Sequence, residues 1–206
     1  MSAPVLTTRR PICTLCRRPQ SGYVCRWIEP ISTAVEVLIL QHPLEVDHAK
    51  NTARLLHLSL PNSTMLMGEA FDASTLPPVA HADKYTVLLY PQTQHNPAPL
   101  ADPVRLRDLK QLRLIVLDAT WRKSRKMLHA NPWLQELPRL SLDNAPTSHY
   151  VIRKAHKPGQ LATLEATCAA LTQLEGAIEK YQPLLQAFKG FVAQQKAFAT
   201  SRIATT

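Results

Sequence analysis

Glycine is scarce in this chain, and the placement of its glycines constrains the fold more than any other feature of the sequence. The five glycines are Gly22, Gly68, Gly159, Gly176 and Gly190. No two of them have the spacing of G-x-G-x-x-G or G-x-x-x-x-G-K-[ST], the loops in which backbone N–H groups approach a phosphate closely. A nucleotide site of the standard Rossmann or P-loop type is therefore excluded.

Short apolar runs alternate with segments of helical periodicity along the chain. The runs at 34–40, 86–90 and 113–117 have the composition of buried strands, and 138–142 and 149–153 are shorter strand candidates. Helices are predicted over 47–58 behind a capping Asp47, after Asp118, over 161–178, and from Pro183 onwards. This alternation predicts an α/β fold with a mainly parallel sheet and a ligand site at the carboxyl ends of its strands. The loops after Tyr90, Leu117 and Leu142 are therefore the places to search.

Length and patterning point to one soluble domain. At 206 residues and 45% hydrophobic composition the chain can bury a substantial core. Its apolar runs fall far short of the roughly 18 residues of a membrane span, and residues 1–10 lack the apolar stretch of a secretory signal. We therefore expect a cytoplasmic protein with no membrane association, whose four cysteines are metal ligands or free thiols rather than disulfides.

The net charge of +9 is unevenly distributed. Residues 1–28 carry five bases and no acids, residues 29–103 carry three bases and eight acids, and residues 104–157 carry twelve bases and four acids. Clustered Lys and Arg most often contact phosphates, although a solvated basic face has the same composition. An amphipathic helix on anionic lipid is a further candidate over 121–134, but Asn131-Pro132 ends it early. Nucleic acid therefore ranks above membrane as the partner.

The basic N-terminal segment contains Cys13-x-x-Cys16 followed by Cys25. Two thiolates at C-x-x-C spacing occupy adjacent corners of a zinc tetrahedron, but a structural zinc site has four ligands. Cys168 lies on the inward face of a predicted helix, so a fourth ligand would come from His42, His48 or His57. The alternatives are a zinc site and three reduced thiols.

Two further groups of residues follow predicted strands. Asp118, Thr120 and Trp121 lead from a predicted strand into a helix with four cations. This arrangement suits a pocket in which the acid accepts a proton, the indole stacks on a nucleobase and the cations bind phosphates. The alternative is that Asp118 or Thr120 caps the helix. Ser148, Tyr150 and Arg153 precede the helix that begins near Leu161. A helix N-terminus there would hold an anion such as a carboxylate, or would be an ordinary capped helix.

An ordered set of motifs in this chain resembles the DTW-domain family, the tRNA-uridine aminocarboxypropyltransferases. The motifs are Cys13-x-x-Cys16 with Cys25, His42-Pro43-x-Glu45, residues 51–56 (NTARLL), Tyr90-Pro91, Asp118-x-Thr120-Trp121, Ser148-x-Tyr150-x-x-Arg153 and Thr163-x-Glu165-Ala166. They extend over residues 9–175. The family pattern departs here at Trp27, where a further cysteine is common, and at Gln92, Ser124 and Ala162.

The resemblance implies a SPOUT-like fold, with a knotted, mainly parallel sheet, helices on both faces and a small cysteine-containing segment at the N-terminus. The division would be residues 1–30 for that segment and 31–206 for the catalytic domain. It also implies transfer of the 3-amino-3-carboxypropyl group of S-adenosylmethionine to N3 of a uridine in tRNA, with release of methylthioadenosine. A SPOUT-type RNA methyltransferase and a non-catalytic RNA-binding protein are the alternatives, and the state is a monomer or a homodimer.

The resemblance also assigns roles to individual residues. Asp118 and Trp121 would be catalytic. The cofactor would be bound by Pro91, Thr120, Leu140, Leu142, Ser148, Tyr150, Thr163 and Glu165. RNA would be bound by Arg122, Lys123, Arg125, Lys126, Arg153 and Lys154, with Arg153 a candidate for the carboxylate of the cofactor as well. Zinc would be bound by Cys13, Cys16 and Cys25.

Overall fold

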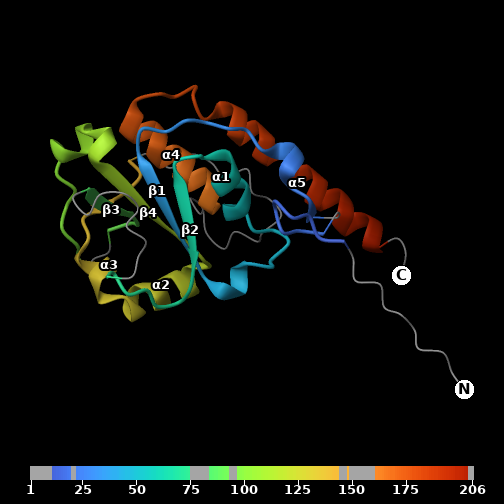
Figure 1. The fold of residues 1–206 in the computed structure, drawn as a ribbon, viewed down its shortest axis with the longest axis horizontal. Coiled ribbons are helices and arrows are strands. Elements are labelled where there is room, and N and C mark those ends of the chain that lie inside the picture. The colour runs from blue at the N-terminus through green and yellow to red at the C-terminus, as the bar shows by residue number, and fades with distance from the viewer. Residues whose placement is uncertain are drawn as a thin grey trace, which may run out of the picture.

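A parallel five-stranded sheet forms the centre of the protein in a computed structural model that describes residues 11–19, 22–74, 84–92, 97–143, 148 and 161–203. The strands are β1 (Glu36–Gln41), β2 (Ser63–Met67), β3 (Tyr85–Leu89), β4 (Leu112–Asp118) and β5 (Arg139–Leu140). Their order is β2-β1-β4-β3-β5, and all four pairings are parallel (Figure 1). The predicted α/β class is confirmed, and the ends of β1 and β4 meet where Gln41 pairs with Asp118.

Helices cover both faces of the sheet, as predicted (Figure 1). The helices are α1 (Ala53–Ser59), α2 (Trp121–Ala130), α3 (Pro132–Glu136), α4 (Thr163–Glu175) and α5 (Gln182–Ile203). One core joins Val37 and Leu114 of the sheet to Leu171 of α4 and to α1 and α5. The other joins Leu38 of the sheet to Met127 of α2 and to α3. Because both faces are covered, the interior strand β1 is buried along its whole length and shows no polar alternation.

The elements differ from the sequence-based expectation in four places. Strand β2 was not predicted, because this half-exposed edge strand begins with Ser63 and Thr64 and lacks a continuous apolar run. Helix α1 begins at Ala53 rather than near Asp47, and the side chain of Asn51, not Asp47, accepts a hydrogen bond from Arg54 N (3.3 Å). The strand predicted over 138–142 is reduced to β5, and the candidate at 149–153 lies outside the described residues.

Helix α4 is also shorter than the predicted 161–178. It ends at Glu175, where Gly176 adopts a left-handed conformation with φ of 65°. A glycine has no Cβ to clash in this conformation, so it stops the helix at low cost. Ile178, which the periodicity placed on the buried face, lies beyond this stop and is exposed.

The N-terminal segment packs against helix α5 near the other end of the chain. The indole N–H of Trp27 donates a hydrogen bond to Gln194 Oε1 (2.6 Å). A Cβ at Gly190 would lie 2.2 Å from the ring of Trp27, so the absence of a side chain there makes room for the indole. Trp27, which stands where the family often has a cysteine, therefore fastens the segment to α5. None of the helices in the part of the chain that the structure describes is long and apolar enough to span a membrane.

Candidate active site at the carboxyl ends of the strands

Asp118 ends the central strand β4 and is almost completely buried, with 3% of its surface exposed. Its Oδ2 accepts hydrogen bonds from Asn51 Nδ2 (2.6 Å) and Gln41 Nε2 (2.8 Å). Its Oδ1 accepts one from Thr163 Oγ1 (2.7 Å). These donors come from the loop before α1, the end of β1 and the first turn of α4. Asp118 is therefore a fixed, buried acid at the carboxyl edge of the sheet, and the helix-cap alternative does not hold for it.

The surroundings of Asp118 make it a stronger base than an exposed aspartate. Burial raises its pKa above the usual range, since a charge is poorly stabilised away from water. The hydrogen bonds from Gln41, Thr163 and Asn51 oppose this rise, and the negative charge of Glu45 adds to it. A carboxylate with a raised pKa is suited to accept a proton during a reaction.

We expect Glu45→Gln to lower the pKa of Asp118, because it removes a negative charge that disfavours ionisation of the carboxyl group. Asp118 should then stay ionised to a lower pH than in the unmodified protein. The measurement is a carboxyl ¹³C NMR titration, with the Asp118 signal assigned from Asp118→Asn. Glu69→Gln is the matched control, because Glu69 does not contribute to the shift of Asp118. An unchanged titration of Asp118 in Glu45→Gln would contradict the prediction.

Trp121 and Tyr90 form an aromatic pair beside this acid. Trp121 is the first residue of α2 and has 44% of its surface exposed, which is high for so large an apolar side chain. Its ring meets that of the buried Tyr90 edge to face, with centroids 5.9 Å apart and planes at 65°. Thr120 Oγ1 accepts a hydrogen bond from Lys123 N (3.4 Å), so the alternative of a helix cap is confirmed for Thr120.

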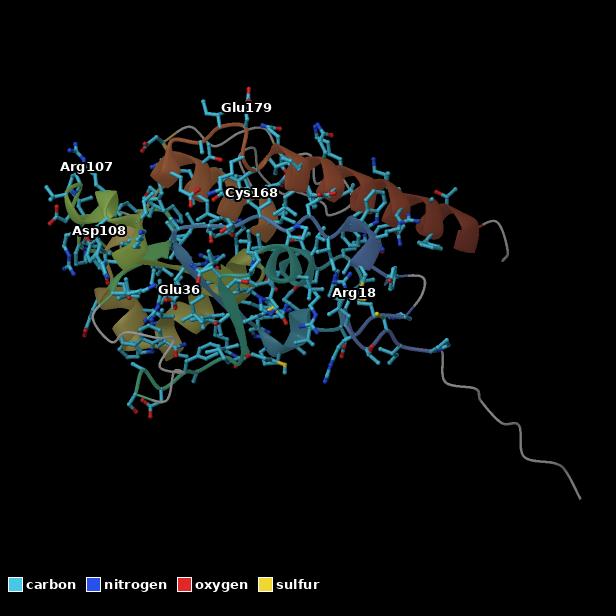
Figure 2. The ribbon with its side chains drawn as sticks, turned by 45° about the horizontal axis from the view of Figure 1, so that its top comes forward. Arg18, Glu36, Arg107, Asp108, Cys168 and Glu179 are labelled. Carbon is cyan, nitrogen blue, oxygen red and sulfur yellow. The ribbon has the colours of Figure 1, made fainter. Side chains whose placement is uncertain are left out.

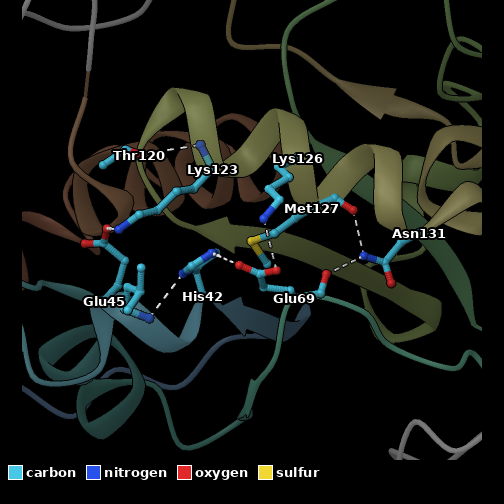
Figure 3. Close-up of polar contacts among 9 residues, drawn as sticks. His42, Glu45, Glu69, Thr120, Lys123, Lys126, Met127 and Asn131 are labelled. Atoms are coloured by element: carbon cyan, nitrogen blue, oxygen red, sulfur yellow. Dashed lines mark hydrogen bonds and ion pairs between the residues drawn. The ribbon is translucent and has the colours of Figure 1, made fainter.

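Two of the four cations on α2 are paired with acids (Figure 3). Lys123 Nζ lies 2.8 Å from Oε1 of the buried Glu45, and Lys126 Nζ lies 3.5 Å from Glu69 Oε2. Glu69 Oε1 also accepts a hydrogen bond from His42 Nε2 (2.6 Å), while His42 Nδ1 accepts one from Leu44 N. Arg122 and Arg125 are exposed and have no ion pair among the described residues. The assignment of the four α2 cations to RNA stays a prediction.

The start of α4 brings together Ser148, Thr163 and Glu165, three of the residues predicted to bind the cofactor. Oε2 of the buried Glu165 accepts hydrogen bonds from Ser148 Oγ (2.7 Å) and from Ala162 N (2.9 Å). The second bond closes the first turn of the helix as one half of a capping box. Because Thr163 bonds Asp118, this cap lies directly beside the buried acid. Tyr150, Arg153 and Lys154 lie outside the described residues.

Strand β5 and the loop after β3 form the remaining border of the candidate site. Leu140 is buried and its carbonyl oxygen accepts a hydrogen bond from Tyr90 N (3.2 Å), while Leu142 is half-buried and Pro91 is exposed. Arg139 is only 3% exposed, and its Nη1 donates to the carbonyl oxygen of Pro91 (3.1 Å). Its guanidinium lies 5.2 Å from the centre of the Tyr90 ring. Its Nε and Nη2 have no hydrogen-bond partner within the described part of the chain.

Cys13, Cys16 and Cys25 converge in the N-terminal segment, with their sulfur atoms all within 4.8 Å of one another. The Sγ atoms of Cys13 and Cys25 are 3.7 Å apart and form no disulfide. Two sulfurs at adjacent corners of a tetrahedron with Zn–S bonds of about 2.3 Å would be about 3.8 Å apart, which fits. Backbone N–H groups of Cys16 and Leu15 lower the pKa of Cys13, whereas burial raises that of Cys25 to about 11. The cluster could therefore hold a metal ion.

Among the residues that the structure describes, no histidine joins the three cysteines as a fourth ligand. His42 is bonded to Glu69, and His57 Nδ1 lies 2.9 Å from Ser63 Oγ. Cys168 lies in the core of α4 as predicted, where burial raises its pKa to about 12. The described residues thus provide three sulfur ligands.

The model of the DTW domain matches residues 10–196, nearly the whole chain. The chain belongs to the DTW-domain family. This confirms the resemblance that the motifs indicated.

Relatives of this DTW domain come from distant organisms. Similar proteins are tRNA-uridine aminocarboxypropyltransferase 2 of Drosophila melanogaster, 30% identical over 186 residues, and tRNA-uridine aminocarboxypropyltransferase A of Arabidopsis thaliana, 31% identical over 194 residues. These matches cover 86% and 81% of this chain, and 72% and 74% of the relatives. The match to tRNA-uridine aminocarboxypropyltransferase 2 of Macaca fascicularis is 28% identical and covers 81% of this chain but 57% of that protein. No solved structure matches this chain.

Two residues at the site of this DTW domain were not found by sequence reasoning. Gln41 donates a hydrogen bond to Asp118. It could have been recognised by the pattern that also marks Asp118, a polar residue that directly follows a buried apolar strand segment. Arg139 gave a weaker signal, a single cation inside a short strand candidate. Asp118 stood in a specific motif and its role stays a prediction, whereas Gln41 and Arg139 stood in no such motif.

Proposed function

We propose that this DTW domain transfers the 3-amino-3-carboxypropyl group of S-adenosylmethionine to N3 of a uridine in tRNA. The observation that carries the proposal is the buried Asp118 carboxyl group with its raised pKa, held at the carboxyl end of β4 inside the DTW signature. The names of the relatives support the same reaction class and the same kind of RNA. We also propose a SPOUT-like knot in the part of the fold around this edge, and a cytoplasmic monomer or homodimer.

In the proposed reaction Asp118 accepts the proton of uridine N3, whose lone pair then forms a bond to the methylene carbon beside the sulfonium sulfur. The bond from that carbon to sulfur breaks and leaves its electron pair on sulfur, which gives neutral methylthioadenosine. The carboxylate acts as general base, because the N3 imide must lose its proton to become a nucleophile. Hydrogen bonds from Gln41, Asn51 and Thr163 keep the carboxylate in one position for this transfer.

The neighbouring residues would form the rest of the site. The exposed face of Trp121 would stack on the uracil or shape the pocket for the transferred chain. Glu165, held by Ser148, would receive the amino group of that chain. The other cofactor contacts would come from Pro91, Thr120, Leu140, Leu142, Tyr150 and Thr163. The cations Arg122, Lys123, Arg125, Lys126, Arg153 and Lys154 would contact RNA.

Mass spectrometry of the products tests the proposed reaction. The protein is incubated with S-adenosylmethionine and tRNA that lacks the modification. Methylthioadenosine, together with a mass gain of one aminocarboxypropyl group on a uridine, would support the proposal. S-adenosylhomocysteine instead would indicate a methyltransferase, and tRNA binding without either product would indicate a non-catalytic RNA-binding protein.

The partnerless N–H groups of Arg139 fit the donor substrate, because a buried guanidinium requires an anion and S-adenosylmethionine carries one carboxylate. We expect Arg139→Met to weaken S-adenosylmethionine binding by about 10- to 100-fold, the equivalent of one lost charged hydrogen-bonding group. Methylthioadenosine, which has no carboxylate, should bind almost as before. Calorimetry with both ligands measures the difference.

The matched control for Arg139→Met is Arg113→Met. Arg113 is an arginine of the same sheet whose Nε donates to Glu36 Oε1 (2.8 Å) at the amino end of the strands, and Glu36 keeps a second partner in Lys84. This control should leave the affinity for both ligands unchanged. Equal losses for S-adenosylmethionine and methylthioadenosine in Arg139→Met would refute a carboxylate-binding role.

We further propose that residues 1–30 are a zinc-binding segment and residues 31–206 the catalytic domain. Cys13, Cys16 and Cys25 would hold the ion, and zinc would act there as a structural crosslink without taking part in the reaction. The separation of the sulfur atoms supports this assignment.

A further inference from the structure

A cavity of about 840 Å³ lies between the N-terminal segment and the carboxyl ends of β1 and β2. Gln41 forms part of its wall, and the same side chain donates a hydrogen bond to Asp118 Oδ2. The cavity is therefore separated from the proposed base by one side chain. We call it the arginine pocket, because Arg17, Arg18 and Arg54 line it.

The charge of the arginine pocket suits an anion. Its three arginines face one acid, Asp47. Arg18 is buried, and its guanidinium donates to the carbonyl oxygens of Ala49 (2.9 Å) and Asn51 (2.6 Å). Its role is therefore structural, because it links the N-terminal segment to the loop before α1. Arg54 is half-exposed and donates to the carbonyl oxygen of Leu15 at 3.3 Å, and Arg17 is exposed. No hydrogen bond or ion pair of the Arg17 side chain is found within the described ranges, which leaves two cations for a ligand.

The lining also includes apolar side chains that are open to solvent. Ile12 and Met67 are 65% and 63% exposed, and the half-exposed Met65 lies beside Met67 on β2. Apolar side chains next to the guanidinium groups of Arg17 and Arg54 match the two parts of a nucleotide, a base with an apolar face and a phosphate. The volume lies within the range of pockets that bury a ligand of this size.

We propose that the arginine pocket binds a nucleotide of the RNA next to the target uridine, with Arg17 and Arg54 on its phosphate. The inference rests on the proposed function, since it places that uridine at Asp118. It extends the RNA path from α2, where Lys123 and Lys126 are also paired with Glu45 and Glu69, to the N-terminal segment.

The test is the affinity of the full chain for unmodified tRNA, measured by fluorescence anisotropy in the absence of S-adenosylmethionine. The double variant Arg17→Gln with Arg54→Gln should bind tRNA at least about 10-fold more weakly, and the slope of log affinity against log salt should fall by roughly two, one for each lost phosphate contact. The affinity for S-adenosylmethionine should not change.

The matched control is Arg107→Gln with Lys110→Gln, which removes the same charge. Both residues are exposed, and Arg107 lies at the opposite end of the molecule from Arg18 (Figure 2). A loss confined to the arginine-pocket variant supports the proposal. Equal losses in the two double variants, or none in the first, overturn it. The failure of the proposed reaction can be distinguished from the failure of this proposal. If the unmodified protein binds tRNA but releases no methylthioadenosine, the proposed reaction is wrong, and the tRNA affinities of the two double variants still test the arginine pocket.

Discussion

Replacing Asp118 by Asn should lower the rate of methylthioadenosine formation by about 10²- to 10⁴-fold, the usual contribution of a general base. An amide cannot take the N3 proton, so the uridine remains a poor nucleophile. The affinity for tRNA should stay nearly the same, because Asp118 is buried and the affinity for RNA comes mainly from contacts to phosphates. Single-turnover kinetics and anisotropy measure the two quantities.

The substitution is informative because the hydrogen-bond network can tolerate it. The amide oxygen of the introduced asparagine, in the position of Oδ2, would still accept from Gln41 and Asn51. The amide nitrogen would then face Thr163, whose hydroxyl group can turn and accept. Asp108→Asn, an exposed aspartate at the far end of the molecule, is the control (Figure 2). Unchanged turnover in Asp118→Asn would exclude the proposed base.

Cys25→Ser should remove the bound metal and loosen the active site with it. Structural zinc sites contribute large binding energies, of about 10–16 kcal/mol in small zinc peptides, and three sulfur ligands leave no redundancy. If even about 2 kcal/mol of folding stability is lost, the unfolding midpoint should fall by about 4–8 °C. Elemental analysis and calorimetry measure the metal content and the midpoint.

The active site should respond because Arg18 lies between Cys16 and Cys25 in the segment that the metal would order. Its guanidinium donates to the carbonyl oxygen of Asn51, whose side chain donates to Asp118. A displaced segment would therefore release one of the partners of the proposed base and slow the proposed reaction.

Cys168→Ala is the control for the loss of a thiol group. Cys168 lies in the core and outside the cluster, so the metal content should not change even if packing suffers. If the purified protein carries no metal after growth with added zinc, the zinc proposal is wrong, and the three cysteines are reduced thiols without a metal ion.

The sequence predicted the parts of this protein that depend on local patterns. Residues of one buried strand are adjacent in the chain, so β1, β3 and β4 and the helices that follow were recognisable from periodicity. Asp118 was found because its motif is contiguous. The hydrogen bonds that hold its side chain link residues 45 to 77 positions apart, and no local pattern contains them. The same holds for the arginine pocket, which joins the N-terminal segment to β1 and β2.

The packing of Trp27 against Gly190 and Gln194 has a consequence for how the protein is made. The hydrogen-bonded pair is separated by 167 residues, so the N-terminal segment leaves the ribosome well before the helix on which it docks. At the usual 5–20 residues per second, the cysteines wait roughly 8–33 s for their docking surface. A metal ion needs only residues 13–25, so it can order the segment during this interval and shield its thiols from oxidation until α5 arrives.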